Sequence, residues 1–400
     1  MKKITLFTGL MILSSVIIGQ GSWTQKVSLP GNGRSASFSF SIGDYGYVGC
    51  GQINSTGTYV NDFWEYNATK DVWTQKADYA GGIRYAATAF SIDTLGYVCL
   101  GYSGICQSDV WSFNPQTNTW TQKNNFPGAA RYGAYAFAIG TNGYVCKGSP
   151  GAPTFYNDFW EYNSLTDTWA QKTSYNSAGC AHGVAFTIGG KGYAGLGTDG
   201  YGDFYSDLNE YDPSTDTWTQ KAAYPSARIA TCFVIGNCAF VGTGISAGLT
   251  YNNNLWKYDP QVDQWSTIAS LGNNYRNGSI SFGIGNRGYL GMGSNSGGSY
   301  LNDLWEYDPN GSGLSVNENS IKNIADVKID LINKNITTTL NAKINDASIK
   351  IYNITGQILI NEKINNTSHK TKLNSLPKGI YIYVVKGNNS YLKVDKFVIM

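Results

Sequence analysis

Apolar and polar residues alternate along this chain in short segments of the kind that strands produce. The third of several similar stretches shows the pattern in full. Residues 132–139 and 144–148 are apolar and aromatic, and the Gly-Thr-Asn-Gly sequence between them is typical of a tight hairpin turn. Residues 158–163 alternate in polarity, and residues 169–172 follow after another turn. The pattern predicts four antiparallel strands in each such stretch.

Two short phrases repeat in step and show how many of these units the chain contains. The first, Trp-Thr-Gln-Lys or a variant of it, returns at intervals of 50, 47, 49, 49 and 47 residues. The second is an aromatic phrase such as Phe-Trp-Glu-Tyr. Four-stranded units at this period stack side by side as the blades of a β-propeller. The first phrase begins at Trp23, Trp73, Trp120, Trp169, Trp218 and Trp265, and the second at Phe63, Val110, Phe159, Leu208, Leu255 and Leu304.

The two phrases are out of register at the ends of the repeats. Trp23 has no copy of the second phrase before it, and Leu304 has no copy of the first phrase after it. Six copies of each phrase make six blades if residues 22–26 complete the last one. We therefore expect an all-β, six-bladed propeller over residues 22–310. Its N-terminal strand closes the ring and removes the open edge that the last blade would otherwise present.

Charge divides the chain into two modules. Residues 21–313 carry 15 Lys and Arg against 21 Asp and Glu, whereas residues 314–400 carry 12 Lys against six acidic residues. The overall net charge of +2 is therefore no indication of a nucleic-acid partner. Residues 311–318 are predicted to be a linker. The alternation in residues 319–400 predicts a small, immunoglobulin-like β-sandwich.

The N-terminus has the features of an export signal. Two lysines and an apolar stretch precede small and polar residues, so residues 1–20 are predicted to be a secretory signal peptide. No other segment is apolar over the length of a membrane span, and we expect no transmembrane segment in the mature chain. The odd number of cysteines, seven, argues against a full disulfide framework.

The repeat resembles the kelch repeat. Each copy presents, in order, an arginine, a Tyr-hydrophobic-x-Gly strand, an Asp-hydrophobic-Trp-x-Tyr strand, an Asp/Asn-Pro turn and a tryptophan, with local variation. Kelch repeats usually carry a glycine doublet after the second strand. Here only one glycine of the doublet remains, as in Cys99-Leu100-Gly101. The resemblance implies a kelch propeller in which this turn is similar but not identical.

The tail resembles the C-terminal sorting domain of bacterial type IX secretion substrates. The matching segments are residues 349–357, 376–383 and the terminal 393–398. This resemblance implies export across the outer membrane, with the type IX machinery as a partner. The product is then secreted or attached at the cell surface after removal of the tail. An immunoglobulin-like adhesive module is the alternative, because it shows similar alternation.

Histidine and aspartate patterns exclude several kinds of enzyme. His369 lies in the tail, so the propeller has His182 alone, whereas copper oxidases of kelch type need two histidines and two tyrosines. His182 is predicted at the start of a strand where other blades carry Gly133 or Gly278. Residues 214–218 lack the glycine and the spacing of a sialidase Asp box.

No metal or cofactor is expected. Asp199, Asp203 and Asp207 are four residues apart, whereas the ligands of a calcium loop stand at alternate positions. The sequence shows no Ser-His-Asp, zinc or phosphate-loop arrangement, and no catalytic residue is assigned.

A recurring arginine points to a ligand instead. It stands seven or eight residues before the isoleucine that ends the first strand, and Cys180 takes its place in blade four. The connection into the first strand and the loop after the second strand lie on one face of a blade. We therefore expect these arginines at the mouth of the central channel, among aromatic residues of the loops. The predicted ligand-binding residues are Arg34, Arg84, Arg131, Arg228 and Arg276, with Tyr59, Phe155, Tyr251 and Tyr300.

Two interpretations of the arginines stay open. Arginine holds carboxylates and sulfates through paired hydrogen bonds, which suits a ligand site. Alternatively, the residue recurs because it bonds neighbouring loops of the repeat to each other.

The sequence therefore predicts an exported kelch propeller that binds a glycan or another extracellular protein. The alternative is a sugar-active kelch enzyme such as a sialic acid mutarotase (epimerase), in which Arg84, Arg131 and Arg276 hold the substrate carboxylate. That enzyme needs an acid–base pair at the channel mouth, and no carboxylate pair breaks the repeat to supply one. A third possibility is a structural surface protein without a selected ligand.

Overall fold

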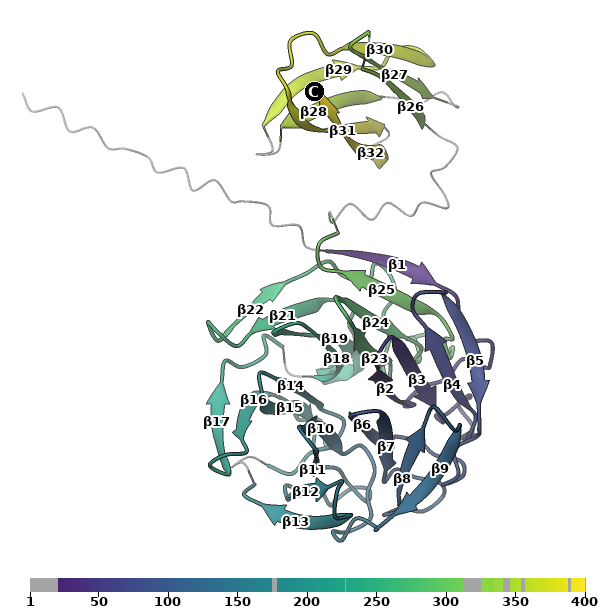
Figure 1. Ribbon diagram of the computed structural model, residues 1–400, viewed down its shortest axis with the longest axis vertical. Helices are drawn as coiled ribbons and strands as arrows, with labels where there is room; N and C mark the ends of the chain where they lie inside the picture. Colours follow the sequence, from purple (N-terminus) through teal and green to yellow (C-terminus); the bar gives the residue numbers. More distant parts are fainter. Residues whose placement is uncertain are drawn as a thin grey trace, which may run out of the picture. The chain divides into compact units, whose positions relative to one another are not determined.

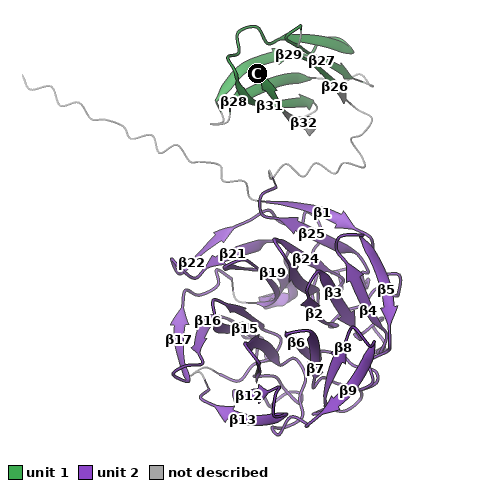
Figure 2. Cartoon of the chain, in the orientation of Figure 1, with its two compact units in different colours: residues 1–19, 312–400 green, residues 20–311 purple. Residues whose placement is uncertain are grey.

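The computed structural model describes residues 21–174, 178–226, 228–311, 325–331, 333–340, 346–353, 357–387 and 390–399. The chain divides into two compact units, and residues 20–311 form the larger one (Figure 2). The predicted signal peptide, residues 1–20, lies outside the described residues, as does the predicted linker beyond Gly311.

Six antiparallel sheets follow one another around a ring in the larger unit (Figure 1). The first blade is β2 (Phe38–Ile42), β3 (Tyr45–Gly49), β4 (Phe63–Asn67) and β5 (Val72–Lys76), and the second is β6 (Thr88–Ile92), β7 (Leu95–Cys99), β8 (Val110–Asn114) and β9 (Thr119–Lys123). The third is β10 (Tyr135–Ile139), β11 (Asn142–Cys146), β12 (Phe159–Asn163) and β13 (Thr168–Lys172), and the fourth is β14 (Val184–Ile188), β15 (Lys191–Thr198), β16 (Phe204–Asp212) and β17 (Thr217–Lys221). The fifth is β18 (Ile229–Ile235), β19 (Cys238–Ser246), β21 (Leu255–Asp259) and β22 (Gln264–Thr267), with β20 (Thr250–Tyr251) paired to β19.

The sixth blade joins the two ends of the propeller. β23 (Ile280–Ile284), β24 (Arg287–Gly291) and β25 (Leu304–Asp308) are its inner strands, and β1 (Ser22–Lys26) is its outermost strand. Trp23 lies opposite Tyr307, and Lys26 lies opposite Leu304. The fold is thus a six-bladed β-propeller, and its last sheet is completed by the N-terminal strand.

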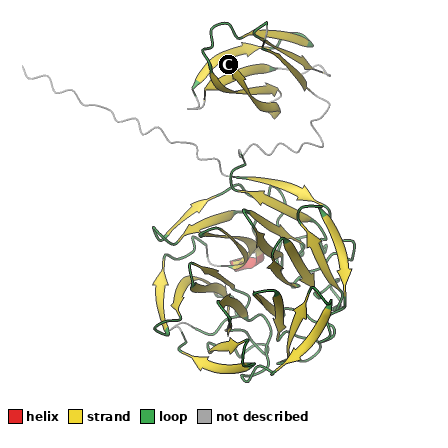
Figure 3. Cartoon of the chain, viewed as in Figure 1, coloured by secondary structure: helices red, strands yellow, loops and turns green. Residues whose placement is uncertain are grey.

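Strand is the dominant structure, and the one helix among the described residues is the short 3-10 turn Ala247–Leu249 (Figure 3). In blade three the first strand is shorter than expected from residues 132–139. Gly133 adopts a φ of 63°, which bends the chain, so Tyr132 forms an isolated bridge with Ser149 and regular pairing begins at Tyr135. No helix in the described part of the chain is long and apolar enough to cross a membrane.

The tryptophan of each outermost strand ties its blade to the preceding one. In blade six, the Trp23 indole N–H donates to the carbonyl of Ala269, which follows the tryptophan strand of blade five. The same bond recurs at every blade boundary. The pairs are Trp23–Ala269, Trp73–Val27, Trp120–Ala77, Trp169–Asn124, Trp218–Thr173 and Trp265–Ala222, with N···O distances of 2.7–3.1 Å.

The hydrophobic core of the propeller lies between blades. Six buried clusters each combine residues of two neighbouring blades, and tryptophans of the two repeated phrases pack against them. Close approach requires glycine at one repeated position. A Cβ on Gly143 would lie 2.2 Å from the ring of Phe90 in the preceding blade. Each blade thus buries its apolar faces only against its neighbours, and the ring is the unit of stability.

The C-terminal unit is a two-sheet sandwich. One sheet has the order β26-β27-β30 and the other β29-β28-β31-β32. Its buried core includes Ile336, Ile349, Ile351 and Val385, each 0% exposed. The strands are β26 (Ala325–Asp330), β27 (Asn335–Leu340), β28 (Ser348–Asn353), β29 (Ile358–Lys363), β30 (Ser368–Lys372), β31 (Gly379–Gly387) and β32 (Ser390–Ile399).

Candidate ligand-binding site at the channel mouth

A ring of small residues surrounds the mouth of the central channel. In each blade, the residue of this ring stands two positions after the recurring arginine, or after Cys180 in blade four, where the chain leads into the first strand. Backbone hydrogen bonds of 2.8–2.9 Å link these residues from blade to blade, from Gly278 through Ala36, Ala86 and Gly133 to His182. All five have positive φ values of 49–64°. The sixth residue, Ala230, departs from the pattern, because β18 begins at Ile229 with a register shift.

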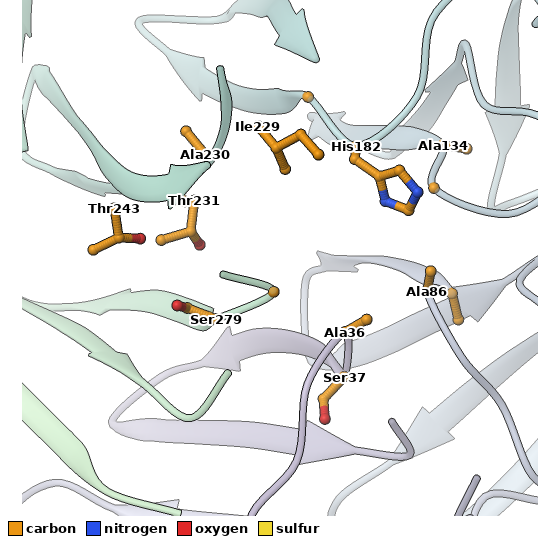
Figure 4. Close-up of a pocket in the computed structure, with 15 residues that line it drawn as sticks. Ala36, Ser37, Ala86, Ala134, His182, Ile229, Ala230, Thr231, Thr243 and Ser279 are labelled. Atoms are coloured by element: carbon orange, nitrogen blue, oxygen red, sulfur yellow. The ribbon is translucent and has the colours of Figure 1, made fainter. Parts of the chain in front are cut away.

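A cavity of about 150 Å³ opens within this ring, and all six blades line it (Figure 4). Hydroxyl groups gather on the side formed by blades five and six, where Thr231, Thr243 and Ser279 lie. Thr243 is 1% exposed, and its Oγ1 has no hydrogen-bond partner in the described structure. Ser279 Oγ is equally without one. Buried polar groups without a partner are rare in folded proteins, and the described residues contain seven others besides these two.

His182 supplies the imidazole of the cavity. It stands where the equivalent residues of the other blades are alanine or glycine, and its ring lies across the cavity from Thr243 (Figure 4). Desolvation by burial lowers the pKa of His182 to about 4. The ring is therefore neutral at pH 7 and offers one donor and one acceptor nitrogen.

Tyrosine rings form an arc at the mouth beside His182. Tyr59 of blade one lies 5.6 Å from Tyr85 and 6.0 Å from Tyr102, measured between ring centroids. Tyr132 lies 6.2 Å from Tyr85 and 5.9 Å from Tyr102, and 5.7 Å from His182. All four tyrosines are partly exposed. We call Tyr59, Tyr85, Tyr102 and Tyr132 the tyrosine arc.

The aromatic residues predicted from the sequence divide into two groups. Tyr59 belongs to the tyrosine arc. Tyr300 lies near the arc and near Tyr251: desolvation by burial and then Tyr251 raise the pKa of Tyr300, and Tyr59 of the arc adds to this rise. Phe155 contacts a different ring, that of Tyr201, at 6.4 Å.

Sequence reasoning missed the other three members of the arc. Tyr85 and Tyr132 directly follow Arg84 and Arg131, and Tyr102 follows the glycine after the second strand. These three tyrosines could therefore have been identified from the sequence, because each lies next to a residue of the repeat.

Four of the predicted arginines are held by carboxylates of their own blades. Arg34 Nη1 and Nη2 lie 2.6 and 2.7 Å from the two oxygens of Asp62, and Arg276 lies 2.7 Å from each oxygen of Asp303. Arg84 binds Asp109, and Arg131 binds Asp158, in the same bidentate way. The second oxygen of each aspartate also accepts a hydrogen bond from the tryptophan two residues later.

These contacts define what the arginines do. Their side chains are at most 1% exposed, and none of them is among the residues that line the cavity. Burial by itself raises the pKa of Asp62, but hydrogen bonds and the charge of Arg34 outweigh it and hold that pKa below its ordinary value. The geometry supports the structural interpretation of the arginines. In these four arginines the Nη donors are bound by the aspartate, and the Nε of Arg84, which has no partner in the described structure, is buried.

Blades four and five depart from this pairing in opposite ways. Blade four has Asp207 but Cys180 in place of the arginine, and burial raises the pKa of Asp207 while the nearby Lys147 opposes that shift. Lys147 is 0% exposed, and its Nζ donates to the carbonyl of Ala178 at 2.7 Å. Blade five has Arg228 but Asn254 in place of the aspartate, with 2.7 Å from Arg228 Nη1 to Asn254 Oδ1.

No metal site emerges from the acidic residues. Asp199 Oδ1 accepts hydrogen bonds from the backbone N–H groups of Tyr201 and Asp203, which shapes their loop. The described residues contain no group of three or more His, Cys, Asp and Glu side chains placed to hold a metal ion.

Comparison with known families identifies the second unit. Residues 332–400 match the model of a secretion system C-terminal sorting domain. The chain ends in a type IX sorting domain. Its presence means that the protein is exported by the type IX system and is secreted or attached at the cell surface.

The propeller is similar to a solved structure titled "Structure of YjhT". The two chains are 17% identical with a TM-score of 0.61, over 69% of this chain and 95% of the other. The likeness shows the fold alone, which the six sheets of this chain define as a β-propeller. No curated protein sequence matches the chain.

Proposed function

We propose that the propeller is an extracellular binding module for a glycan, held at the channel mouth by the tyrosine arc and the cavity beside it. One observation carries the proposal. Aromatic rings of three successive blades and an imidazole from the fourth lie together beside a cavity that all six blades line. Pockets with aromatic walls and a few placed polar groups are the usual form of small-ligand sites.

The chemistry of a sugar matches this arrangement. One face of a pyranose ring carries C–H groups that pack against an aromatic ring, while its hydroxyls need hydrogen-bond partners. Tyrosine combines an apolar ring with a polar end, which suits such a surface. Export by the type IX system places the module where glycans occur.

The enzymatic alternative receives less support from the cavity. A sugar mutarotase needs an acid and a base near the reacting carbon, and His182 is the one ionisable side chain among the described residues that line the cavity. The arginines assigned to the substrate carboxylate are already bound to aspartates. A binding module needs neither group.

A glycan array probed with the exported protein tests the proposal. We expect saturable binding that falls at least tenfold in a Tyr59→Ala/Tyr102→Ala variant. Tyr201→Ala is the matched control, because Tyr201 is 65% exposed and contacts Phe155 rather than the arc. Equal binding by the arc variant and the wild type would refute the site. Absence of any glycan signal, with capture of a purified surface protein instead, would favour an extracellular protein as the ligand.

A further inference from the structure

The four rings of the tyrosine arc contact one another in a closed circuit. The order of the contacts is Tyr59, Tyr85, Tyr132, Tyr102 and back to Tyr59, with centroid separations of 5.6, 6.2, 5.9 and 6.0 Å. Residues on opposite corners of the circuit make no ring contact with each other in the described structure. The rings therefore stand around a common centre.

This centre is close to all four rings. For a circuit with these side lengths, whatever its shape, the point midway between the centroids of Tyr59 and Tyr132 lies no more than about 6 Å from each centroid, and the face of an aromatic ring attracts a cation over about this distance. The interplanar angles are 33°, 53°, 65° and 86°, so no contact is parallel stacking. The rings stand as walls at angles to one another, which suits a compact group between them better than the flat face of a sugar ring.

The four phenolic hydroxyl groups are available to a ligand. All four side chains are partly exposed, and no hydrogen bond within the described residues reaches any of these hydroxyls. The phenols also lie near one another, because burial and then Tyr132, Tyr59 and Tyr300 raise the pKa of Tyr85 to about 12. Burial raises the pKa of Tyr132 as well. Tyr85 and Tyr132 are therefore uncharged at pH 7, and their oxygen atoms can accept hydrogen bonds.

Positive charge next to the arc is already balanced. Arg84 and Arg131 directly precede two of its tyrosines, and each forms an ion pair with an aspartate of its own blade. Arg228, whose partner is an amide, belongs to blade five, whereas the arc is built from blades one to three. Over the propeller as a whole, residues 21–313 carry 15 Lys and Arg against 21 Asp and Glu. This excess of acidic residues attracts a positively charged ligand.

From these observations we propose that the tyrosine arc receives the ammonium group of an amino sugar. The ring faces attract the positive charge. The N–H groups of the ammonium donate to the phenolic oxygens, which a quaternary ammonium without N–H groups cannot do. The inference rests on the proposed glycan-binding function and names the class of glycan, one with free amines such as a polymer of glucosamine. The same glycan with acetylated amines carries no charge and is bound weakly.

Titration calorimetry of the exported protein at pH 6 with two tetrasaccharides tests this selection. The tetramers of glucosamine and of N-acetylglucosamine have the same backbone, but the amines are protonated in the first and acetylated in the second. We expect the glucosamine tetramer to bind more tightly by about tenfold or more. Equal affinities, or tighter binding of the acetylated tetramer, would overturn the inference.

Variants distinguish the arc from the overall acidity of the propeller. Tyr59→Leu and Tyr102→Leu should each weaken binding of the glucosamine tetramer about tenfold, because each removes one aromatic wall. Tyr102→Phe keeps the ring and removes the hydroxyl, so we expect a smaller loss of about threefold. Unchanged affinity in both leucine variants would show that charge alone holds the tetramer, and the inference would fail.

Tyr201→Ala is the matched control for these variants. Tyr201 is 65% exposed and lies outside the arc, so its loss should leave the affinity for the glucosamine tetramer unchanged. Melting temperatures verify that every variant is folded. If one of the two leucine variants does not fold, the result of the other decides.

The outcomes separate this inference from the proposed function. If glycans bind and the Tyr59→Ala/Tyr102→Ala variant loses them, but the two tetramers bind equally, the arc is a glycan site without selection for amines. The inference then fails and the proposed function stands. If no glycan binds at all, both proposals fail.

Discussion

Of the five buried arginines, Arg228 alone meets an amide instead of a carboxylate. Asn254 Oδ1 accepts one hydrogen bond from it, and burial lowers the pKa of the guanidinium. Trp256 Nε1, whose counterparts donate to an aspartate, is buried without a partner in the described structure. Asparagine in place of the aspartate of the repeat accounts for the single hydrogen bond between Arg228 and residue 254 and for the missing partner of Trp256.

Asn254→Asp should therefore stabilise the propeller. The new carboxylate would pair with Arg228 and accept from Trp256, and satisfying these buried donors contributes about 1–3 kcal/mol. Urea unfolding at pH 7 measures the change. Asp109→Asn, the reverse change in blade two, should destabilise by a comparable or larger amount. A less stable Asn254→Asp variant would show that the site is adapted to the amide.

The ion pairs also set the response to acid. Burial raises the pKa of Asp62, Asp158 and Asp303, but their arginines outweigh this effect and lower it overall. A depressed folded-state pKa contributes stability that is complete above the unfolded pKa, near 4, and is lost as pH falls through the folded value. We expect the melting temperature to fall steeply below pH 4, and to change little from these groups between pH 5 and 8. An Asp62→Asn variant should have a lower melting temperature at pH 7, and its melting temperature should fall less steeply below pH 4.

The arginines also show what the sequence could and could not provide. Their spacing predicted that they lie at equivalent places, and the aspartate two residues before each tryptophan marks their partners. The direction of a side chain is not encoded in a spacing. Whether Arg84 faces a ligand or Asp109 depends on which group lies within reach in the folded blade. His182 and Thr243 were harder still, because a departure from a repeat has meaning only when the cavity beside it is known.

At the scale of elements, strand order follows from the repeat and strand length does not. Most strands have five residues, as the repeated phrases suggest. β15 and β16 are longer, Lys191–Thr198 and Phe204–Asp212, because the loop between them continues the pairing from Gly197 to Thr198 after an irregularity. Loop residues vary between blades, so the repeat carries no information about such extensions.

The strand β1 is an element whose removal has a defined effect. Deleting residues 22–26 removes the outer strand of blade six together with Trp23, which is 6% exposed. Loss of one buried tryptophan alone costs about 3–5 kcal/mol, and the exposed edge of β25 adds to it. Differential scanning calorimetry should show a large fall in melting temperature. Deletion of the five loop residues 54–58 is the matched control, and an equal effect of both deletions would contradict closure by β1.

At the scale of the whole molecule, the two units have separate tasks. The propeller has its own buried core in six clusters, and the sorting domain has another. Truncation after Gly311 should therefore leave a propeller with an unchanged melting temperature, since it retains every blade. The truncated protein should accumulate in the periplasm rather than reach the surface or the medium. Cell fractionation measures this, and normal secretion of the truncated form would show that another signal directs export.

The pairing of the first strand with the last also constrains when the protein becomes native. Lys26 lies opposite Leu304, which is 278 positions further along the chain (304 − 26). Contacts this distant in sequence are slow to form. Until β25 arrives, β1 is an unpaired edge strand, the kind of segment that pairs with other chains. A chain that ends before Leu304 cannot form the pairing of β1 with β25 that closes the propeller. The propeller can therefore fold completely only after its last strand has been synthesised. A truncated propeller would keep an open sheet edge.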